Sequence, residues 1–306
     1  MNTQAQPSVL MRWYMASRPR SLTATYVPIG LGGVLAYQDG VFDFIAFVLA
    51  LLGTLMLQIS ANLFNEYYDF RKGSDKKKTH GLGMIIARGL LTPQQVFIGG
   101  ILTLIFGILI GLYFVWSAGL LVFWIGLGGV LAVILYTAGP YPLAYIGLGE
   151  ITVFVFMGPA IVIGAYYVQA KTVSTEAIWG GIPIAFLVAN ILHANNLRDL
   201  EADKAEGKHT LATIFGRQFA RHEYLVLTAG AFVSTFILWL LGIAPLLTVA
   251  VVILLPEAFQ LIRTAYATVD AGELHQVLLR TARLHRWFGI VYVGAWLLAI
   301  LINDLI

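Results

Sequence analysis

Long apolar runs separated by short polar stretches make up most of the chain. A helix needs about 20 mostly apolar residues to cross a bilayer, and the runs are close to that length. We predict nine such helices, at about residues 21–38, 42–64, 94–114, 117–136, 145–168, 177–197, 222–241, 244–263 and 287–304. The pattern indicates an all-α integral membrane protein with nine transmembrane helices in one domain, residues 1–306.

Composition supports this interpretation. Of the 306 residues, 59% are hydrophobic and 11% are charged, whereas a soluble domain carries roughly a quarter of charged residues. The chain has no cysteine, which excludes a disulfide framework, a thiolate metal site and a cysteine nucleophile. Any chemistry must therefore come from the polar stretches between the apolar runs.

The basic residues gather on one side of the predicted membrane. With nine spans, all 19 Lys and Arg residues except Lys171 lie before the first run or in loops on the same side as it. Basic loops mark the cytoplasmic side. We therefore expect a multi-pass protein of the inner (plasma) membrane, with a cytoplasmic N-terminus and the C-terminus outside.

Two acidic polar segments follow the second and sixth runs, both on the predicted cytoplasmic side. The first contains Asn65, Asp69 and Asp75, and the second contains Asp199 and Asp203. A spacing of four residues places two side chains on one face of a helix, where two carboxylates repel each other. A bound Mg²⁺ would relieve this repulsion, and Mg²⁺ prefers carboxylate, phosphate and water oxygens. We interpret these five residues as candidate metal ligands.

Cationic side chains accompany both segments and would balance the charge of a diphosphate. The candidates are Lys72, Arg88, Arg198, Lys204 and Lys208. The spacing alone leaves two interpretations open, a metal-diphosphate site and solvated loops held at the surface by their charge. A transporter is a third possibility, but it would carry ionisable groups near the middle of its spans, whereas these clusters lie at helix ends.

At these residues the chain resembles the UbiA-type family of intramembrane aromatic prenyltransferases. The two motifs of that family are Asn-x-x-x-Asp followed by a further Asp, and Asp-x-x-x-Asp. The similarity covers nearly the whole chain and is closest to the MenA branch, the 1,4-dihydroxy-2-naphthoate polyprenyltransferases of menaquinone synthesis. The phrases that carry it are Asn-Glu-Tyr-Tyr-Asp at 65–69, Lys-Gly-Ser-Asp at 72–75, Gly-Pro-Tyr-Pro-Leu at 139–143, Asn-Asn-Leu-Arg-Asp at 195–199 and Gly-Lys-His-Thr-Leu at 207–211.

The resemblance implies a helical bundle around a central cavity, with cap loops on the cytoplasmic side. It implies a Mg²⁺-dependent enzyme that transfers a polyprenyl group from polyprenyl diphosphate to 1,4-dihydroxy-2-naphthoate. CO₂ and diphosphate would be released and demethylmenaquinone formed. The implied partners are these two substrates and the lipid bilayer, with no nucleic acid. Homogentisate and 4-hydroxybenzoate remain alternative acceptors within the family.

Five further residues are candidates for orienting the acceptor or stabilising an allylic cation. They are Tyr136, Tyr141, Tyr145, Glu150 and Asn196. Aromatic ring faces attract cations, although the tyrosines also fit an aromatic belt at the membrane interface. Glu150 is costly in lipid unless it is paired, and otherwise faces the headgroups. We expect His193, one turn before the second motif, to be packed and hydrogen-bonded.

The chain departs from the family pattern after Asp75. Residues 76–80, Lys-Lys-Lys-Thr-His, are more basic than that pattern. Residues 81–84, Gly-Leu-Gly-Met, replace a phrase that is richer in glycine. Because the corresponding loop in the family closes over the substrate, this departure bears on the choice of acceptor.

Overall fold

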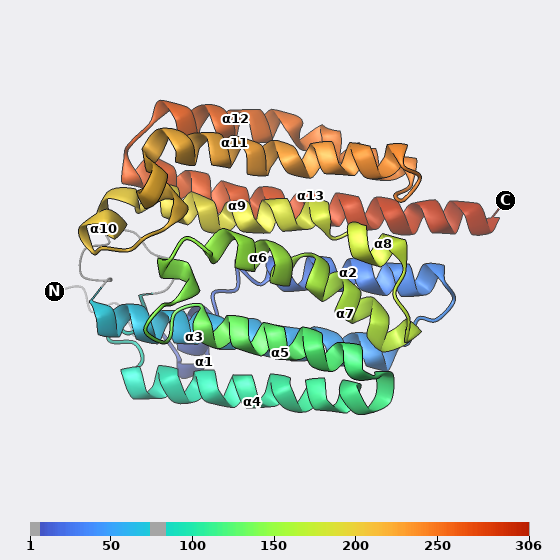
Figure 1. Cartoon of the computed structure of the whole chain (residues 1–306), viewed down its shortest axis with the longest axis horizontal. Coiled ribbons are helices and arrows are strands. Elements are labelled where there is room, and N and C mark those ends of the chain that lie inside the picture. Colours follow the sequence, from blue (N-terminus) through green and yellow to red (C-terminus); the bar gives the residue numbers. More distant parts are fainter. Residues whose placement is uncertain (1–6, 74–83, 306) are drawn as a thin grey trace.

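The computed structural model describes residues 7–73 and 84–305, and every regular element within them is a helix (Figure 1). In chain order these are α1 (Val9–Ala16), α2 (Thr23–Gln38), α3 (Phe44–Lys72), α4 (Pro93–Ala118), α5 (Leu120–Leu135), the 3₁₀ turn η2 (Leu143–Tyr145), α6 (Gly149–Met157), α7 (Pro159–Ala170), α8 (Thr175–Trp179), α9 (Ile182–Arg198), α10 (Leu200–Ala205), α11 (Leu211–Leu240), the 3₁₀ helix η3 (Leu246–Leu254), α12 (Leu255–Ala267) and α13 (Ala271–Leu305). The predicted all-helical class is confirmed.

Seven helical segments in the described part of the chain are long and apolar enough to cross a membrane. They are Phe44–Lys72, Pro93–Ala118, Gly149–Ala170, Thr175–Arg198, Leu211–Leu240, Leu246–Ala267 and Ala271–Leu305. Each corresponds to one of the predicted runs. The first and fourth runs are also helical, but α2 and α5 have only 16 residues each, which is short for a span.

The long helices run along the length of the bundle (Figure 1). Helix α3 packs on α4, and α9 packs on both α11 and α13. The C-terminal end of α3 lies at the same end of the bundle as α10. The two acidic segments, 130 residues apart in the chain, are therefore brought to the same end of the molecule.

Aromatic side chains of α13 fix the position of α9. Phe288, Tyr292 and Trp296 are spaced four residues apart, so they share one face of the helix, and all three are fully buried. Phe288 stacks on Tyr292 with ring centroids 5.9 Å apart. The Tyr292 hydroxyl donates a hydrogen bond to the Gly180 carbonyl (3.2 Å), just before α9. This cluster anchors the helix that carries the second acidic segment.

Glycine allows the two halves of the predicted fifth span to approach α9. The span breaks into α6 and α7 at Gly158, which is followed by Pro159. A Cβ atom at Gly158 would lie 2.4 Å from the Ala185 Cβ and 3.0 Å from the Ala185 Cα. The close contact therefore needs glycine at this break.

A similar contact between α2 and α7 gives a test of the packing. A Cβ atom at Gly32 would lie 2.6 Å from the Ala165 Cβ and 2.9 Å from the Val162 carbonyl oxygen. We expect Gly32→Ala to destabilise the protein by about 1–3 kcal/mol, as overpacked cores do. The measurement is thermal unfolding in detergent.

Gly30 in the same helix is the matched control. The nearest atom to a Cβ at that position is the Val293 Cγ1 at 3.8 Å, an ordinary contact. Alanine has a higher helix propensity than glycine by about 1 kcal/mol, so Gly30→Ala should leave the melting temperature unchanged or raise it. Equal melting temperatures for wild type and Gly32→Ala would contradict the close approach of α2 and α7.

Candidate functional site

A cavity of about 380 Å³ lies among α2 to α7 and α9. Apolar and small residues line most of it, including Leu57, Ile110, Phe114, Ile125 and Phe156. Most of the polar lining residues belong to one region, and they are Arg18, Ser21, Gln58, Asn62, Asn65, Asp69, Tyr136, Thr137, Tyr145, Asn195, Asn196 and Lys208; Thr54 and Thr152 also line the cavity. The cavity thus combines a long apolar wall with a polar region that contains parts of both acidic segments.

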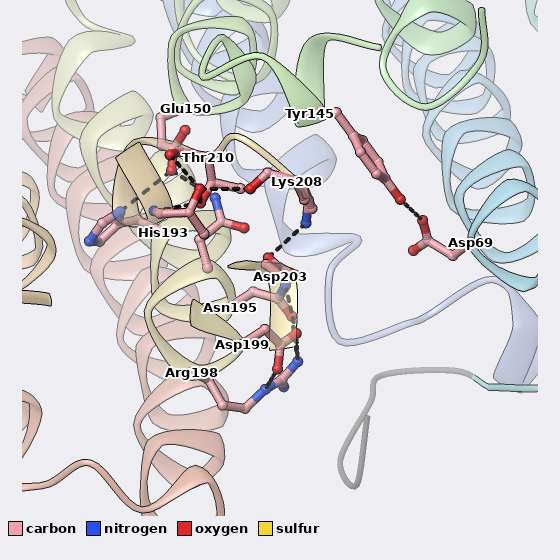
Figure 2. Close-up of polar contacts among 12 residues, drawn as sticks. Asp69, Tyr145, Glu150, His193, Asn195, Arg198, Asp199, Asp203, Lys208 and Thr210 are labelled. Carbon is pink, nitrogen blue, oxygen red and sulfur yellow. Dashed lines mark hydrogen bonds and ion pairs between the residues drawn. The ribbon is translucent and has the colours of Figure 1, made fainter. Parts of the chain in front are cut away.

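The first acidic segment ends helix α3. Asn65 and Asp69 are half-buried and line the cavity. The Tyr145 hydroxyl donates a hydrogen bond to the Asp69 Oδ1 (3.0 Å; Figure 2). The Oδ1 of Asn65 is buried and has no hydrogen-bond partner among the described residues. Asp75, the third candidate of this segment, lies outside the described residues.

The second acidic segment spans the junction of α9 and α10. The Asp203 amide donates to the Asp199 carbonyl (2.8 Å), so the backbone keeps the helical four-residue spacing across the junction. Both aspartates are buried, with 7% exposure for Asp199 and 0% for Asp203. Asn195, one turn earlier, lines the cavity and donates from its amide to the Asp199 Oδ2 (3.4 Å).

Each of these two aspartates has a cationic partner from its own segment (Figure 2). The Arg198 guanidinium donates to both carboxylate oxygens of Asp199, at 2.7 and 2.6 Å, the bidentate geometry of strong ion pairs. The Lys208 ammonium donates to the Asp203 Oδ2 (3.0 Å). Arg198 and Lys208 therefore offset the repulsion that we inferred between the two carboxylates. From the sequence we assigned these two cations only to a diphosphate.

Two of the candidate cations lie beside the ring of Tyr145. The Lys72 Nζ is 3.9 Å from the ring centroid and donates to the Thr137 carbonyl (3.2 Å), and the Lys208 Nζ is 5.3 Å from the same centroid. Arg88 and Lys204 are exposed and do not line the cavity. The structure thus brings Lys72 and Lys208 to the polar region, places Arg198 against Asp199, and leaves Arg88 and Lys204 at the surface.

The loop that carries Tyr145 is joined to the loop that carries Lys208. Ile146 and His209 form an isolated parallel bridge, in which the His209 amide donates to the Tyr145 carbonyl (3.1 Å). Tyr136 also lines the cavity, whereas Tyr141 is 77% exposed and does not. Two of the three candidate tyrosines therefore face the cavity.

Glu150 lies behind the cavity wall. It is buried and does not line the cavity, but its Oε1 accepts a hydrogen bond from the Asn196 amide (2.8 Å), and Asn196 does line it. Glu150 therefore does not reach the cavity directly, contrary to what we expected of a residue that contacts the acceptor. It is joined to the cavity through Asn196. Asn196 is the candidate that meets the cavity.

His193 connects Glu150 to a second carboxylate that the sequence analysis missed. The His193 Nε2 lies 2.7 Å from the Ala220 carbonyl oxygen. Its Nδ1 lies 3.5 Å from the Glu150 Oε1 and 3.3 Å from the Glu223 Oε2. His193 is fully buried and hydrogen-bonded, as expected. We did not identify Glu223 from the sequence, because it lies at the edge of the predicted seventh run, which begins at residue 222. In the structure, α11 begins at Leu211 and carries Glu223 inside the bundle.

This buried network generates a stability prediction. Glu150→Leu should lower the free energy of unfolding by about 3 kcal/mol, because it leaves the buried polar groups of His193 and Asn196 without a partner. Glu150→Gln keeps an oxygen acceptor for Asn196 and should cost less. Thermal unfolding in detergent measures both. A melting temperature of Glu150→Leu equal to that of the wild type would refute the role of this network.

Comparison with known proteins agrees with this geometry. Residues 26–284 match the UbiA prenyltransferase family. The chain is 36% identical over 230 residues to the 1,4-dihydroxy-2-naphthoate octaprenyltransferase of Bacillus subtilis (strain 168), covering 75% of this chain and 72% of the relative. It is also 36% identical over 241 residues to the enzyme of that name from Escherichia coli (strain K12), covering 76% of this chain and 77% of the relative.

A solved structure shares the fold. A UbiA homologue from Archaeoglobus fulgidus, bound to DMAPP and Mg²⁺, superposes with a TM-score of 0.62 at 16% identity, and the match covers 92% of this chain and 99% of the other. The family match extends over most of the chain, and the resemblance inferred from the motifs is confirmed. The chain belongs to the UbiA prenyltransferase family.

Proposed function

We propose that this protein transfers a polyprenyl group from polyprenyl diphosphate to 1,4-dihydroxy-2-naphthoate. CO₂ and diphosphate are released, and the quinol form of demethylmenaquinone is made, which a separate two-electron oxidation converts to demethylmenaquinone for menaquinone synthesis. The observation that carries the proposal is a mostly apolar cavity whose polar region holds Asp69 of the first acidic motif and Asn195, which lies one turn before the second motif and bonds to its Asp199. The names of the Bacillus and Escherichia relatives support the choice of acceptor.

The polar region has the donors that Mg²⁺ prefers. Asn65 offers a buried oxygen with no partner in the described part of the chain, and Asp69 accepts only a neutral phenol hydrogen bond in the contacts found here. Together with Asp199 and Asp203, which lie outside the cavity lining and pair with Arg198 and Lys208, they would form an all-oxygen set, which suits a hard cation. Asp75 completes the set in the motif. Bound Mg²⁺ would neutralise diphosphate charge and improve it as a leaving group.

The cationic side chains would bind the diphosphate from beside Tyr145. Lys72 and Lys208 both lie against its ring. Arg198 holds Asp199 in place through its bidentate pair, and its contacts with Asn195 and His275 among the described residues leave one of its five N–H groups for a phosphate oxygen. Arg88 and Lys204, both exposed, remain candidates for contacts from the surface.

The apolar wall would hold the prenyl chain and exclude water. Departure of the diphosphate leaves an allylic cation, which water would otherwise capture. Tyr136 and Tyr145 present aromatic rings to the cavity, and ring faces stabilise cations, whereas Tyr141 remains a candidate from the surface. The ring carbon of the acceptor forms the new C–C bond. Its bond to the carboxyl group then breaks, CO₂ departs, and the electron pair restores the aromatic ring.

We also propose that α2 and α5 cross the membrane together with the seven longer segments. This gives nine spans around the cavity, which would then be central and open to the polyprenyl chain from the bilayer. The distribution of basic residues supports an inner-membrane protein with a cytoplasmic N-terminus and the C-terminus outside. A periplasmic reporter fused after Ile306 would be inactive if this orientation were wrong.

The test of function is turnover by the purified protein. With Mg²⁺, a polyprenyl diphosphate and 1,4-dihydroxy-2-naphthoate, we expect equal amounts of diphosphate and CO₂ and the formation of demethylmenaquinol, which air oxidises to demethylmenaquinone. Mass spectrometry of the product and release of labelled CO₂ measure this. If the protein turned over homogentisate or 4-hydroxybenzoate but not the naphthoate, the proposed acceptor would be wrong. The family assignment would still stand.

The acidic motifs give a second prediction. Asp69→Ala and Asp199→Ala should each lower kcat/KM by at least about 100-fold, because metal ligands are lost from the diphosphate site. Glu201→Gln is the matched control, since this carboxylate lies between Asp199 and Asp203 but is 74% exposed and pairs with Arg217. It should retain activity within about twofold. Near-normal activity of either alanine variant would contradict the site.

A further inference from the structure

Arg18 is a cation of the polar region for which the sequence analysis found no chemical role. It lies between α1 and α2 and lines the cavity. Its φ is +53°, an uncommon conformation for a residue other than glycine. The Ser21 amide (2.8 Å) and the Ser21 hydroxyl (2.9 Å) both donate to the Arg18 carbonyl and hold this turn. Such strained residues cluster at functional sites.

A buried carboxylate holds the Arg18 side chain from behind. The Arg18 Nη2 donates to the Glu66 Oε2 (3.1 Å), and Glu66 is only 3% exposed. Glu66 also accepts hydrogen bonds from the amides of Met84 (3.1 Å) and Ile86 (3.2 Å). Because two backbone donors share the charge of Glu66, the guanidinium is positioned by this carboxylate without being fully engaged by it.

The guanidinium has donors left for a ligand. It carries five N–H groups, and its hydrogen bond to Glu66 uses one of them. The Nε is buried and has no partner among the residues that the structure describes, whereas the side chain as a whole is 21% exposed and reaches the cavity. A buried, charged N–H group without a partner is unfavourable, so an anion in the cavity would satisfy it.

Arg18 comes from a different part of the chain than the cations beside Tyr145, namely the turn between α1 and α2. Its cavity-lining neighbours are Asn62 and Gln58 of α3, which bind the same turn. Asn62 donates to the Ser17 carbonyl (2.9 Å), and Gln58 donates to the Ser21 carbonyl (2.8 Å). These residues precede Asn65 and Asp69 on α3 by one to three helical turns. The turn that carries Arg18 is therefore held by Gln58 and Asn62, whereas its guanidinium reaches Glu66, which lies between Asn65 and Asp69 in α3.

We propose that Arg18 binds the carboxylate of the aromatic acceptor and selects acceptors that carry one. The inference rests on the proposed function, whose two substrates bring two anions into one cavity. Lys72, Lys208 and the acidic ligand set already serve the diphosphate. The planar guanidinium fork matches a carboxylate. The acceptor keeps its carboxylate while it binds and while the C–C bond forms. The contact with Arg18 therefore acts mainly on binding of the acceptor, and Arg18 determines the specificity for acceptors that carry a carboxylate.

Steady-state kinetics with both substrates test this role. Arg18→Gln should raise KM for 1,4-dihydroxy-2-naphthoate by about 10- to 100-fold, the value of a hydrogen bond to a charged group. KM for the polyprenyl diphosphate should change by less than about twofold, and Arg18→Lys should lie between wild type and Arg18→Gln. Arg20→Gln is the matched control, because Arg20 is exposed, lies two residues away and does not line the cavity.

Two kinetic outcomes would overturn the proposal. A raised KM for the diphosphate with an unchanged KM for the naphthoate would assign Arg18 to the diphosphate. Unchanged values for both substrates would remove Arg18 from binding altogether.

Calorimetric binding gives a readout that does not depend on turnover, and its wild-type arm does not depend on folding of the variant. Wild type should bind 1,4-dihydroxy-2-naphthoate at least about 10-fold more tightly than 1,4-dihydroxynaphthalene, which lacks the carboxylate, and Arg18→Gln should lose this preference. Equal affinities in the wild type would overturn the proposal. If the preference is present but the wild type does not prenylate the naphthoate, the proposed function fails and the binding role of Arg18 stands.

Discussion

The polar end of this bundle depends on the pairing of buried carboxylates. Glu66, Glu150, Asp199 and Asp203 are each at most 7% exposed, and a buried charge is unfavourable unless it is paired and hydrogen-bonded. Three of them join separate elements: Glu66 joins α3 to Arg18, Met84 and Ile86, Glu150 joins α6 to His193 of α9, and Asp203 joins α10 to Lys208. Asp199 pairs with Arg198, the residue before it. Apolar packing holds the rest of the bundle, and ion pairs hold the end where chemistry is proposed.

These pairs also prepare the site for exchange of partners. A buried ion pair adds little net stability, because the loss of hydration offsets the attraction between the charges. Asp199 and Asp203 are satisfied by Arg198 and Lys208 in the protein alone. In the proposed function, a metal ion and a diphosphate would take over the carboxylates and the cations respectively, so that every charge would keep a partner of opposite sign.

Local patterns in the sequence predicted the helices and the family, and longer-range contacts account for what was missed. The four-residue spacings of Asn65 with Asp69 and of Asp199 with Asp203 lie within single helical turns. Helix α13 begins at Ala271 rather than near 287, because arginines lower the hydropathy of its first half without interrupting the helix; one of them, Arg280, pairs with Glu257 of α12. The contact of Glu223 with His193 and that of Arg18 with Glu66 join residues 30 or more positions apart, and no periodicity reports such contacts.

The bridge between Ile146 and His209 joins two loops that are far apart in the chain. One loop carries Tyr145, the partner of Asp69, and the other carries Lys208, the partner of Asp203. A single backbone hydrogen bond thus fixes the relative register of both acidic motifs. An insertion or deletion in either loop would misalign the two motifs at once. Chimeras with other members of the family would therefore have to exchange both loops as one cassette, together with the strand-like pairing between them.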